Sequence, residues 1–181
     1  MRYLLFLIVC VPSLLSAQNR DTYEIYSQII MNDFKNDSLI TIENVTTFGL
    51  GDTFEQDYKY LKNFLKKLKL ETYNDFKFKN VKSDTIKDNF SNKSFKVIIL
   101  SRAIADSIFE KGNGWSDFYL KYGETQGLLS FSKIGFDKNR SQALLYYGNQ
   151  SDWLAGAGYY VLFEKKNGKW IEISSIMAWI S

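Results

Sequence analysis

The C-terminal part of the chain consists of strand-forming segments separated by turn residues, and this pattern constrains the fold more than any other feature. Asn167 and Gly168 stand between the last two segments, and an Asn-Gly pair in that position is the strongest short signal for a tight β-hairpin. We therefore expect a four-stranded antiparallel meander. Its strands are predicted from aromatic and β-branched runs at residues 128–136, 143–148, 158–165 and 169–180.

The preceding residues show helical patterns with two strands among them. Apolar residues at helical spacing predict a helix over residues 22–35, with Asp21 and Glu24 forming a reciprocal cap at its start. Thr53 opens a second capped helix, whose apolar face ends at Leu68. Shorter helices are expected at residues 71–80, 101–112 and 115–122, and strands at residues 38–47 and 95–100.

The two parts together predict one α+β domain over residues 18–181. We expect the N-terminal helices to pack on one face of the C-terminal antiparallel β-meander. No internal repeat and no linker divides this region, and its length suits a single hydrophobic core.

The first 17 residues have the order of a removable signal peptide. Arg2 supplies a positive start, residues 3–11 form an apolar run, and small residues lead to Ala17, after which we expect cleavage. The apolar part is too short to span a bilayer comfortably as a helix. This interpretation predicts export to the periplasm or the cell exterior, with no transmembrane segment after cleavage. The alternatives are lipid attachment at Cys10 and an uncleaved membrane anchor.

The chain contains no His, and its only Cys and only Pro are Cys10 and Pro12, inside the predicted signal peptide. The exported domain therefore has neither His nor Cys. This composition excludes a thiolate nucleophile, a Ser-His relay and the ordinary zinc or copper sites, so we expect no metal and no cofactor. Removing Arg2 from the 23 basic residues leaves 22 against 20 acidic ones, which is too even a balance to indicate nucleic-acid binding.

Residues 149–160 are the segment most typical of a binding site. Most of them form a predicted loop, at residues 149–157, that is longer than a hairpin needs. We expect Trp153 and Tyr159 to stack on a sugar or contact a partner protein, with Asp152 accepting hydrogen bonds and Tyr147 close by. The alternative is a simple connection between strands, with Trp153 folded onto the sheet.

Three functions are compatible with these features. The first, which we favour, is a non-catalytic domain that binds a protein or a glycan of the cell envelope. The second is a hydrolase with a pair of carboxylates, as in glycosidases, drawn from Glu43, Asp52 and Glu55. The third is a structural or accessory subunit of an envelope assembly, in which a β surface is buried against other subunits.

Lysines also repeat along one flank of the second predicted helix, at positions 59, 62, 66 and 69. A row of this kind is typical of a solvated helix face. The alternative is a contact with an anionic surface polymer or with lipid headgroups.

Short segments along the chain form a recognisable set. Its members are YEIYS (23–27), FSKIGFD (131–137), ALLYYG (143–148), GAGYYVL (156–162), KNGKW (166–170) and WIS (179–181). This set resembles a family of uncharacterised secreted or envelope proteins of bacteria, and the resemblance covers nearly all of residues 18–181. It implies export and supplies no activity. Relatives carry a Cys pair, four residues apart, where this chain has Ser151 and Ala155, which implies a disulfide that this chain has lost.

Overall fold

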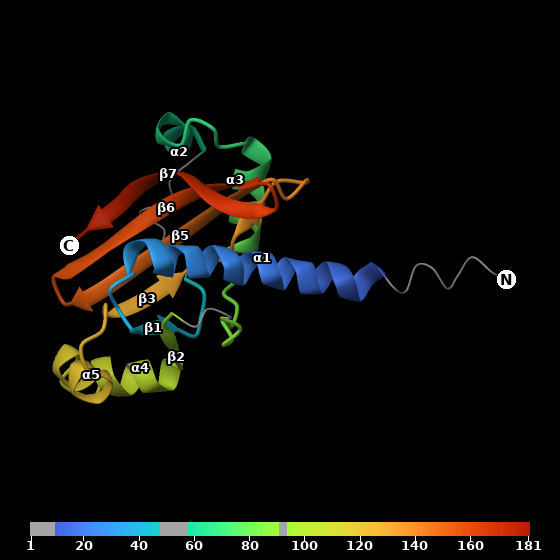
Figure 1. Ribbon diagram of the computed structural model, residues 1–181. Helices are drawn as coiled ribbons and strands as arrows, with labels where there is room; N and C mark the ends of the chain where they lie inside the picture. The colour runs from blue at the N-terminus through green and yellow to red at the C-terminus, as the bar shows by residue number, and fades with distance from the viewer. Residues whose placement is uncertain (1–9, 48–57, 91–93) are drawn as a thin grey trace.

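The computed structural model describes residues 10–47, 58–90 and 94–181, with side chains from Arg20 onward. The strands are β1 (Leu39–Glu43), β2 (Lys96–Leu100), β3 (Leu128–Phe131), β4 (Gly135–Phe136), β5 (Gln142–Asp152), β6 (Ala155–Lys166) and β7 (Lys169–Ile180). The helices are α1 (Cys10–Asp33), α2 (Tyr58–Phe64), α3 (Leu70–Lys79), α4 (Arg102–Phe109) and α5 (Trp115–Tyr122). The strands form one sheet in the order β2-β1-β3-β5-β6-β7, with β4 paired to β5 beside this path (Figure 1). The predicted α+β fold is confirmed.

The long strands β5, β6 and β7 form the core of the predicted meander, and their pairing is antiparallel throughout. Asn167 and Gly168 make the turn between β6 and β7, with φ angles of 51° and 78°. A type I′ turn needs a positive φ at both positions, which Asn and Gly adopt most readily. The hairpin expected from these two residues is therefore confirmed.

The prediction of a single strand over residues 128–136 is wrong. This segment is divided into β3 and β4, which pair with β5 at two separate places. Between them, the three residues 132–134 lie opposite only two residues of β5, so the chain bulges. The hydroxyl of Ser132 accepts a 2.9 Å hydrogen bond from the backbone nitrogen of Tyr146 and stabilises the bulge.

Strand β1 joins the meander to the other edge of the sheet by parallel pairing on both of its sides, with β2 and with β3. The strands expected at residues 38–47 and 95–100 are present in shorter form. Their parallel pairing was not predicted, because it depends on contacts between distant parts of the chain. The sheet is therefore mixed, with β2 and β7 at its two edges.

Helix α1 lies across one face of the sheet (Figure 1). Ile25, Ile29 and Ile30 are fully buried there and belong to one apolar cluster with Leu145 and Phe163. Ile25 stands four residues before Ile29 and five before Ile30, which places all three on one side of the helix, as the sequence predicts. The cleavage point expected after residue 17 falls inside this helix, at a position where only the backbone is described.

Asp21 lies within α1, so the reciprocal cap predicted at this position is wrong. Its carboxylate is turned to the sheet and accepts hydrogen bonds from Lys165 at 2.7 Å and from Arg140 at 3.0 Å. The indole Nε1 of Trp170 donates a third hydrogen bond, also at 3.0 Å. We call these four residues the Asp21 cluster. A local sequence pattern suggested a cap, but long-range partners occupy the carboxylate.

Helices also cover the opposite face of the sheet, which corrects the expectation that the N-terminal helices share one face. Leu145 of β5 faces α1, whereas its neighbour Leu144 packs with residues of α2 and α3. Helices α4 and α5 cover the same outer face over β1–β3, where Leu128 is part of their apolar cluster. Strands β5 and β6 have apolar residues on both sides, so both sides have to be covered.

The second predicted helix is present in part. Its described portion is α2, and the predicted start at Thr53 lies outside the described residues. Leu61, Leu65 and Leu68 are all buried in the cluster beneath α2 and α3, as the helical spacing predicts. The helix ends before Leu68, and that residue is reached through a turn.

The indole of Trp179 on β7 occupies space that side chains on β6 would need. A Cβ placed on Gly158 would lie 2.1 Å from its Nε1, and one placed on Gly156 would lie 3.0 Å from its Cη2. The same Nε1 donates a 2.8 Å hydrogen bond to the hydroxyl of Tyr146. The glycines of this part of β6 thus serve the close approach of a neighbouring ring.

Candidate functional site

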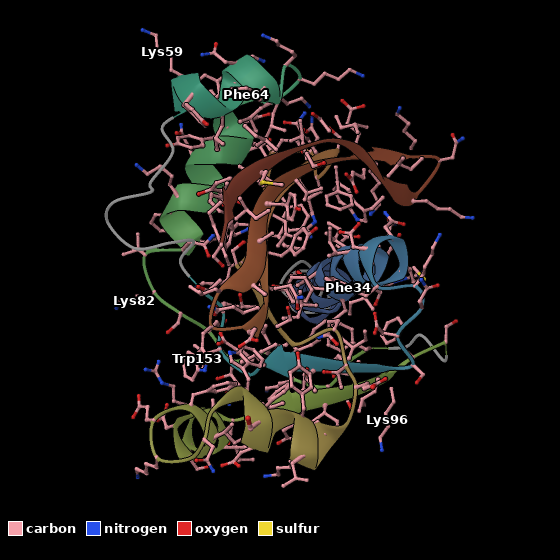
Figure 2. The ribbon with its side chains drawn as sticks, turned by 90° about the vertical axis from the view of Figure 1, so that its left-hand side faces the viewer. Phe34, Lys59, Phe64, Lys82, Lys96 and Trp153 are labelled. Carbon is pink, nitrogen blue, oxygen red and sulfur yellow. The ribbon has the colours of Figure 1, made fainter. Side chains whose placement is uncertain are left out.

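A cavity of about 630 Å³ lies between the end of α1 and the face of β5, β6 and β7 that α1 covers. We call it the tyrosine pocket. Residues from the helix end and from all three strands line it, including Asp33, Phe34, Tyr147, Asn149, Tyr159 and Glu172. Figure 2 shows Phe34 at the end of α1, beside the curved sheet. The volume of the tyrosine pocket is in the range of small-molecule sites in proteins.

Two tyrosines form the aromatic wall of the pocket. Tyr147 on β5 and Tyr159 on β6 are directly opposite in the strand register, and their rings stack with centroids 5.4 Å apart and an angle of 22° between the planes. Tyr147 is buried and Tyr159 is half-buried. The outer ring of the pair is therefore the one that a ligand would meet.

Tyr147 donates a hydrogen bond of 2.5 Å from its hydroxyl to Oδ2 of Asp33. Burial raises the pKa of Tyr147, and the hydrogen bond to Asp33 together with the charge of that carboxylate raises it further. The phenol therefore stays protonated and keeps donating at any physiological pH. Asp33 is the last residue of α1, where the helix dipole disfavours a negative charge. The hydrogen bond from Tyr147 supplies this carboxylate with a donor at that place.

The polar groups of the pocket are mainly hydrogen-bond acceptors. Asp33 and Glu172 contribute carboxylates, and no Lys or Arg is among the described residues that line the pocket. Asn149 donates from Nδ2 to the carbonyl of Gln126 at 2.7 Å, while its Oδ1 is buried with no hydrogen-bond partner in the described chain. The pocket is therefore suited to a neutral or cationic ligand that brings donors.

The loop predicted at residues 149–157 is wrong, because most of it is paired. Strand β5 continues to Asp152 and β6 begins at Ala155, so only Trp153 and Leu154 form the tip of the hairpin. Residues 149–152 are all polar and residues 155–158 are all Ala or Gly, so the segment lacks the alternation that marks a strand. Ser151 Oγ lies 3.3 Å from the carbonyl oxygen of Ala155, so these two positions are neighbours across the hairpin.

Trp153 leans on α4 and α5, away from the tyrosine pocket. Its side chain is 61% exposed, but its ring meets Phe109 edge to face at 6.3 Å and fills the space beside Gly114. Figure 2 shows it between the sheet and this helical layer. The carboxylate of Asp152 accepts a 2.7 Å hydrogen bond from the backbone nitrogen of Trp153. Tyr119 of α5 donates to the carbonyl of Ser151 at 2.8 Å and fixes the tip.

The four residues predicted from the sequence therefore lie in two places. Tyr147 and Tyr159 come together in the tyrosine pocket, whereas Asp152 and Trp153 are at the hairpin tip. Sequence reasoning missed the pocket's polar residues, Asp33, Asn149 and Glu172. Only two signals were available for them: an acidic residue at a helix C-terminus, and Asn149 two positions after Tyr147, on the same side of a strand.

Of the three residues from which the carboxylate pair was predicted, Glu43 lies in the described part of the chain. Glu43 lines a second cavity, of about 390 Å³, at the carboxyl end of β1, together with Arg102, Asp106 and Glu110. Burial raises the pKa of Glu43, and the charge of Arg102 partly offsets this effect. Asp52 and Glu55 lie outside the described residues. Within the described part of the chain, no group of three acidic, His or Cys side chains is placed to hold a metal ion.

The chain matches no protein-family model, no curated protein and no solved structure. No helix among the described residues is long and apolar enough to cross a membrane. Function therefore has to be inferred from the chemistry of the chain's own sites.

Proposed function

We propose that this protein is an exported, non-catalytic binding domain that holds a glycan of the cell envelope in the tyrosine pocket. The observation that carries the proposal is the stacked pair of Tyr147 and Tyr159 beside the carboxylates of Asp33 and Glu172. A sugar ring presents an apolar face and a rim of hydroxyl donors. The pocket offers an aromatic surface and oxygen acceptors within one cavity, which suits both features.

The charge of the pocket narrows the class of glycan. Asp33 and Glu172 make the cavity negative, and the described lining contains no Lys or Arg to balance them. An anionic sugar would be repelled at this short range, whereas neutral hydroxyls or a protonated amino group would be attracted. We therefore expect neutral or amino sugars to bind in preference to uronic acids or phosphorylated sugars.

Titration calorimetry with soluble fragments of envelope glycans tests the proposal, using neutral, amino and acidic oligosaccharides. Tyr159→Ala should weaken binding of the best ligand by about tenfold or more, because it removes the exposed ring of the stack. Trp153→Ala removes an aromatic side chain at the hairpin tip and is the matched control, with affinity retained. The proposal is wrong if no fragment binds, or if Trp153→Ala abolishes binding and Tyr159→Ala leaves it intact.

A carboxylate-dependent hydrolase is the second candidate, and one observation favours it. Glu43 has a raised pKa in the second cavity, which suits a general acid, and Asp106 in the same cavity is held by Arg102 at 3.4 Å. Assays with chromogenic glycosides and esters test it. Turnover that disappears in Glu43→Gln would establish the activity, and no turnover above background by the wild-type protein would eliminate it.

The edge of the sheet favours binding over assembly. Strand β7 is an open edge with Ile171, Met177 and Ile180 exposed, as a subunit contact would need. However, its register with β6 shifts twice, next to Trp179 and next to Ser174. Bulges of this kind interrupt the row of backbone groups that another strand would pair with. A dimer in sedimentation analysis that Met177→Lys dissociates would restore the assembly hypothesis.

A further inference from the structure

The surface of α2, α3 and the turn after them has a charge unlike the rest of the chain. Residues 58–82 contain eight Lys and two acidic residues, Glu71 and Asp75, which gives a net charge of +6. The whole chain has a formal net charge of +3, so the other residues together carry −3. The positive charge of this protein is therefore concentrated in one structural unit.

Only part of this charge is neutralised within the fold. Lys69 pairs with Asp137 at 2.6 Å and Lys79 with Asp75 at 2.7 Å. In contrast, Lys59, Lys66 and Lys82 are exposed, and no described carboxylate lies within 4.0 Å of them. The described part of the chain therefore forms no ion pair with these three side chains.

The same unit also exposes apolar side chains, which a merely solvated helix face would not need. It holds five of the twelve exposed large hydrophobic residues of the described chain, and among them Phe64 is 53% and Phe78 is 80% exposed. The rings of Tyr60 and Phe64 contact each other at 5.2 Å, so both lie on one side of α2. Leu70 and Phe78 lie on the side of α3 that points away from its buried residues. The other exposed member is Val81.

The position of the unit allows it to meet a flat surface. Helix α2 forms one end of the molecule, opposite the layer of α4 and α5 (Figures 1 and 2). Lys59 points outward from this end in Figure 2. A flat surface at this end would reach Lys59 and Phe64 before it met the hairpin tip with Trp153.

We propose that the outer surface of α2 and α3 docks on an anionic lipid bilayer, with lysines on the headgroups and the exposed Phe, Leu and Tyr side chains in the interface. Lysines near such a surface each contribute about fivefold in affinity through attraction to anionic lipids. Aromatic and aliphatic side chains add binding by burial at the boundary of headgroups and acyl chains. An acidic polysaccharide would engage the lysines but would gain little from the exposed Phe64 and Phe78.

Vesicle co-sedimentation of the full chain tests this proposal, with phosphatidylglycerol–phosphatidylcholine vesicles and with phosphatidylcholine alone. The charge-reversal variant combines Lys59→Glu, Lys66→Glu and Lys82→Glu and should weaken binding to the anionic vesicles about 100-fold. Its matched control reverses three exposed lysines elsewhere, Lys96, Lys111 and Lys121, and should bind like the wild type. Insertion of the apolar N-terminal residues into vesicles would be equal in both variants and independent of lipid charge. The differences between the variants therefore report on α2 and α3.

A second variant separates lipid from other anionic surfaces. Phe64→Ser with Phe78→Ser should reduce vesicle binding by about tenfold or more and leave binding to heparin, used as a soluble anionic polymer, unchanged. Circular dichroism checks that all variants are folded; both rings are exposed, so little stability should be lost. Equal vesicle binding by the two charge-reversal variants would overturn the proposal. Unchanged vesicle binding by the Phe variant would overturn the insertion of its side chains.

Discussion

The two parts of α1 place an aspartate against the same face of the sheet, with opposite results. Asp21 is buried, and its carboxylate is satisfied by Lys165, Arg140 and Trp170. Asp33, at the other end, receives the hydroxyl of Tyr147 and borders an open cavity. The partners of Asp21 hold α1 to the sheet, and its buried carboxylate is not accessible to a ligand. The arrangement at Asp33 leaves acceptor capacity at a surface, which is what a binding site requires.

The electrostatics of the two ends differ accordingly. Burial alone would raise the pKa of Asp21, but hydrogen bonds from Lys165, Trp170 and Arg140 outweigh it, and the pKa is lowered. The charged form is thus the stable form in the folded protein. At the other end it is the phenol of Tyr147 whose pKa is raised, so the hydrogen-bond partner of Asp33 is kept neutral. The carboxylate of Asp21 is thus balanced by two cations, whereas the partner of Asp33 is a neutral hydroxyl.

Asp21→Asn should have the largest effect on stability. It leaves the cations of Lys165 and Arg140 without their counter-charge in a largely buried cluster, and we expect a loss of about 3 kcal/mol in the free energy of unfolding. Urea denaturation followed by Trp fluorescence measures it. Asp33→Asn is the matched control at the other end, with a loss below about 1 kcal/mol. Equal losses would remove the distinction between the two ends.

Asp137→Asn should come next, in the turn that also carries Arg140. Burial would raise the pKa of Asp137, but hydrogen bonds from Lys69, Ser141 and the backbone of Gln142 lower it to about 2. Because the folded pKa is below the unfolded one, this stabilisation is present above about pH 4 and is lost as the pH falls toward 2. The shift corresponds to about 2 kcal/mol.

The measurement is the free energy of unfolding at a series of pH values between about 7 and 2. The variant should start lower than the wild type at neutral pH, and the two curves should converge in acid. Parallel curves over the whole range would show that Asp137 is not responsible for the acid sensitivity.

Tyr147→Phe should have a smaller effect on stability than either change at the Asp21 end. It removes the hydroxyl that bonds to Asp33 while the buried ring and its stacking on Tyr159 are kept, so we expect a loss of about 1 kcal/mol. Chemical denaturation checks this value. A loss as large as that of Asp21→Asn would mean that the pocket end is also built for stability.

Trp153→Ala should have the smallest effect on the free energy of unfolding, below about 1 kcal/mol, because more than half of the side chain is already exposed. Thermal unfolding by circular dichroism is the measurement. A drop of several degrees would instead show that its contacts with Phe109 and Gly114 hold the hairpin to α4 and α5.

Features that depend on neighbouring residues were predictable from the sequence. Asn167 and Gly168 specify their turn through their own φ preferences, and Leu61 and Leu65 are buried because a helix places them on one side. The helix expected at residues 101–112 is present as α4, and the hydroxyl of Ser101 caps it by accepting a hydrogen bond from the backbone nitrogen of Ile104. In each case the partners are a few residues apart.

Features that depend on distant contacts were not predictable in the same way. The bond between Asp33 and Tyr147 joins residues 114 positions apart, and that between Asp21 and Trp170 joins residues 149 apart. The parallel pairing of β1 with β2 and β3 also depends on contacts between residues far apart in the sequence. The aromatic half of the candidate site could be identified from the sequence because Tyr147 and Tyr159 are in strands of one hairpin. Of the two carboxylates, Asp33 comes from a helix on the other side of the pocket and Glu172 from β7.

The position of Trp179 over Gly156 and Gly158 restricts the order in which this part of the protein can change during evolution. A side chain at Gly158 collides with the indole as long as Trp179 is present, whereas loss of the indole first would open the space. Which residues are tolerated at position 158 thus depends on which residue is already present at position 179. Sequences with a residue larger than Gly at 158 are therefore expected to carry a smaller residue at 179.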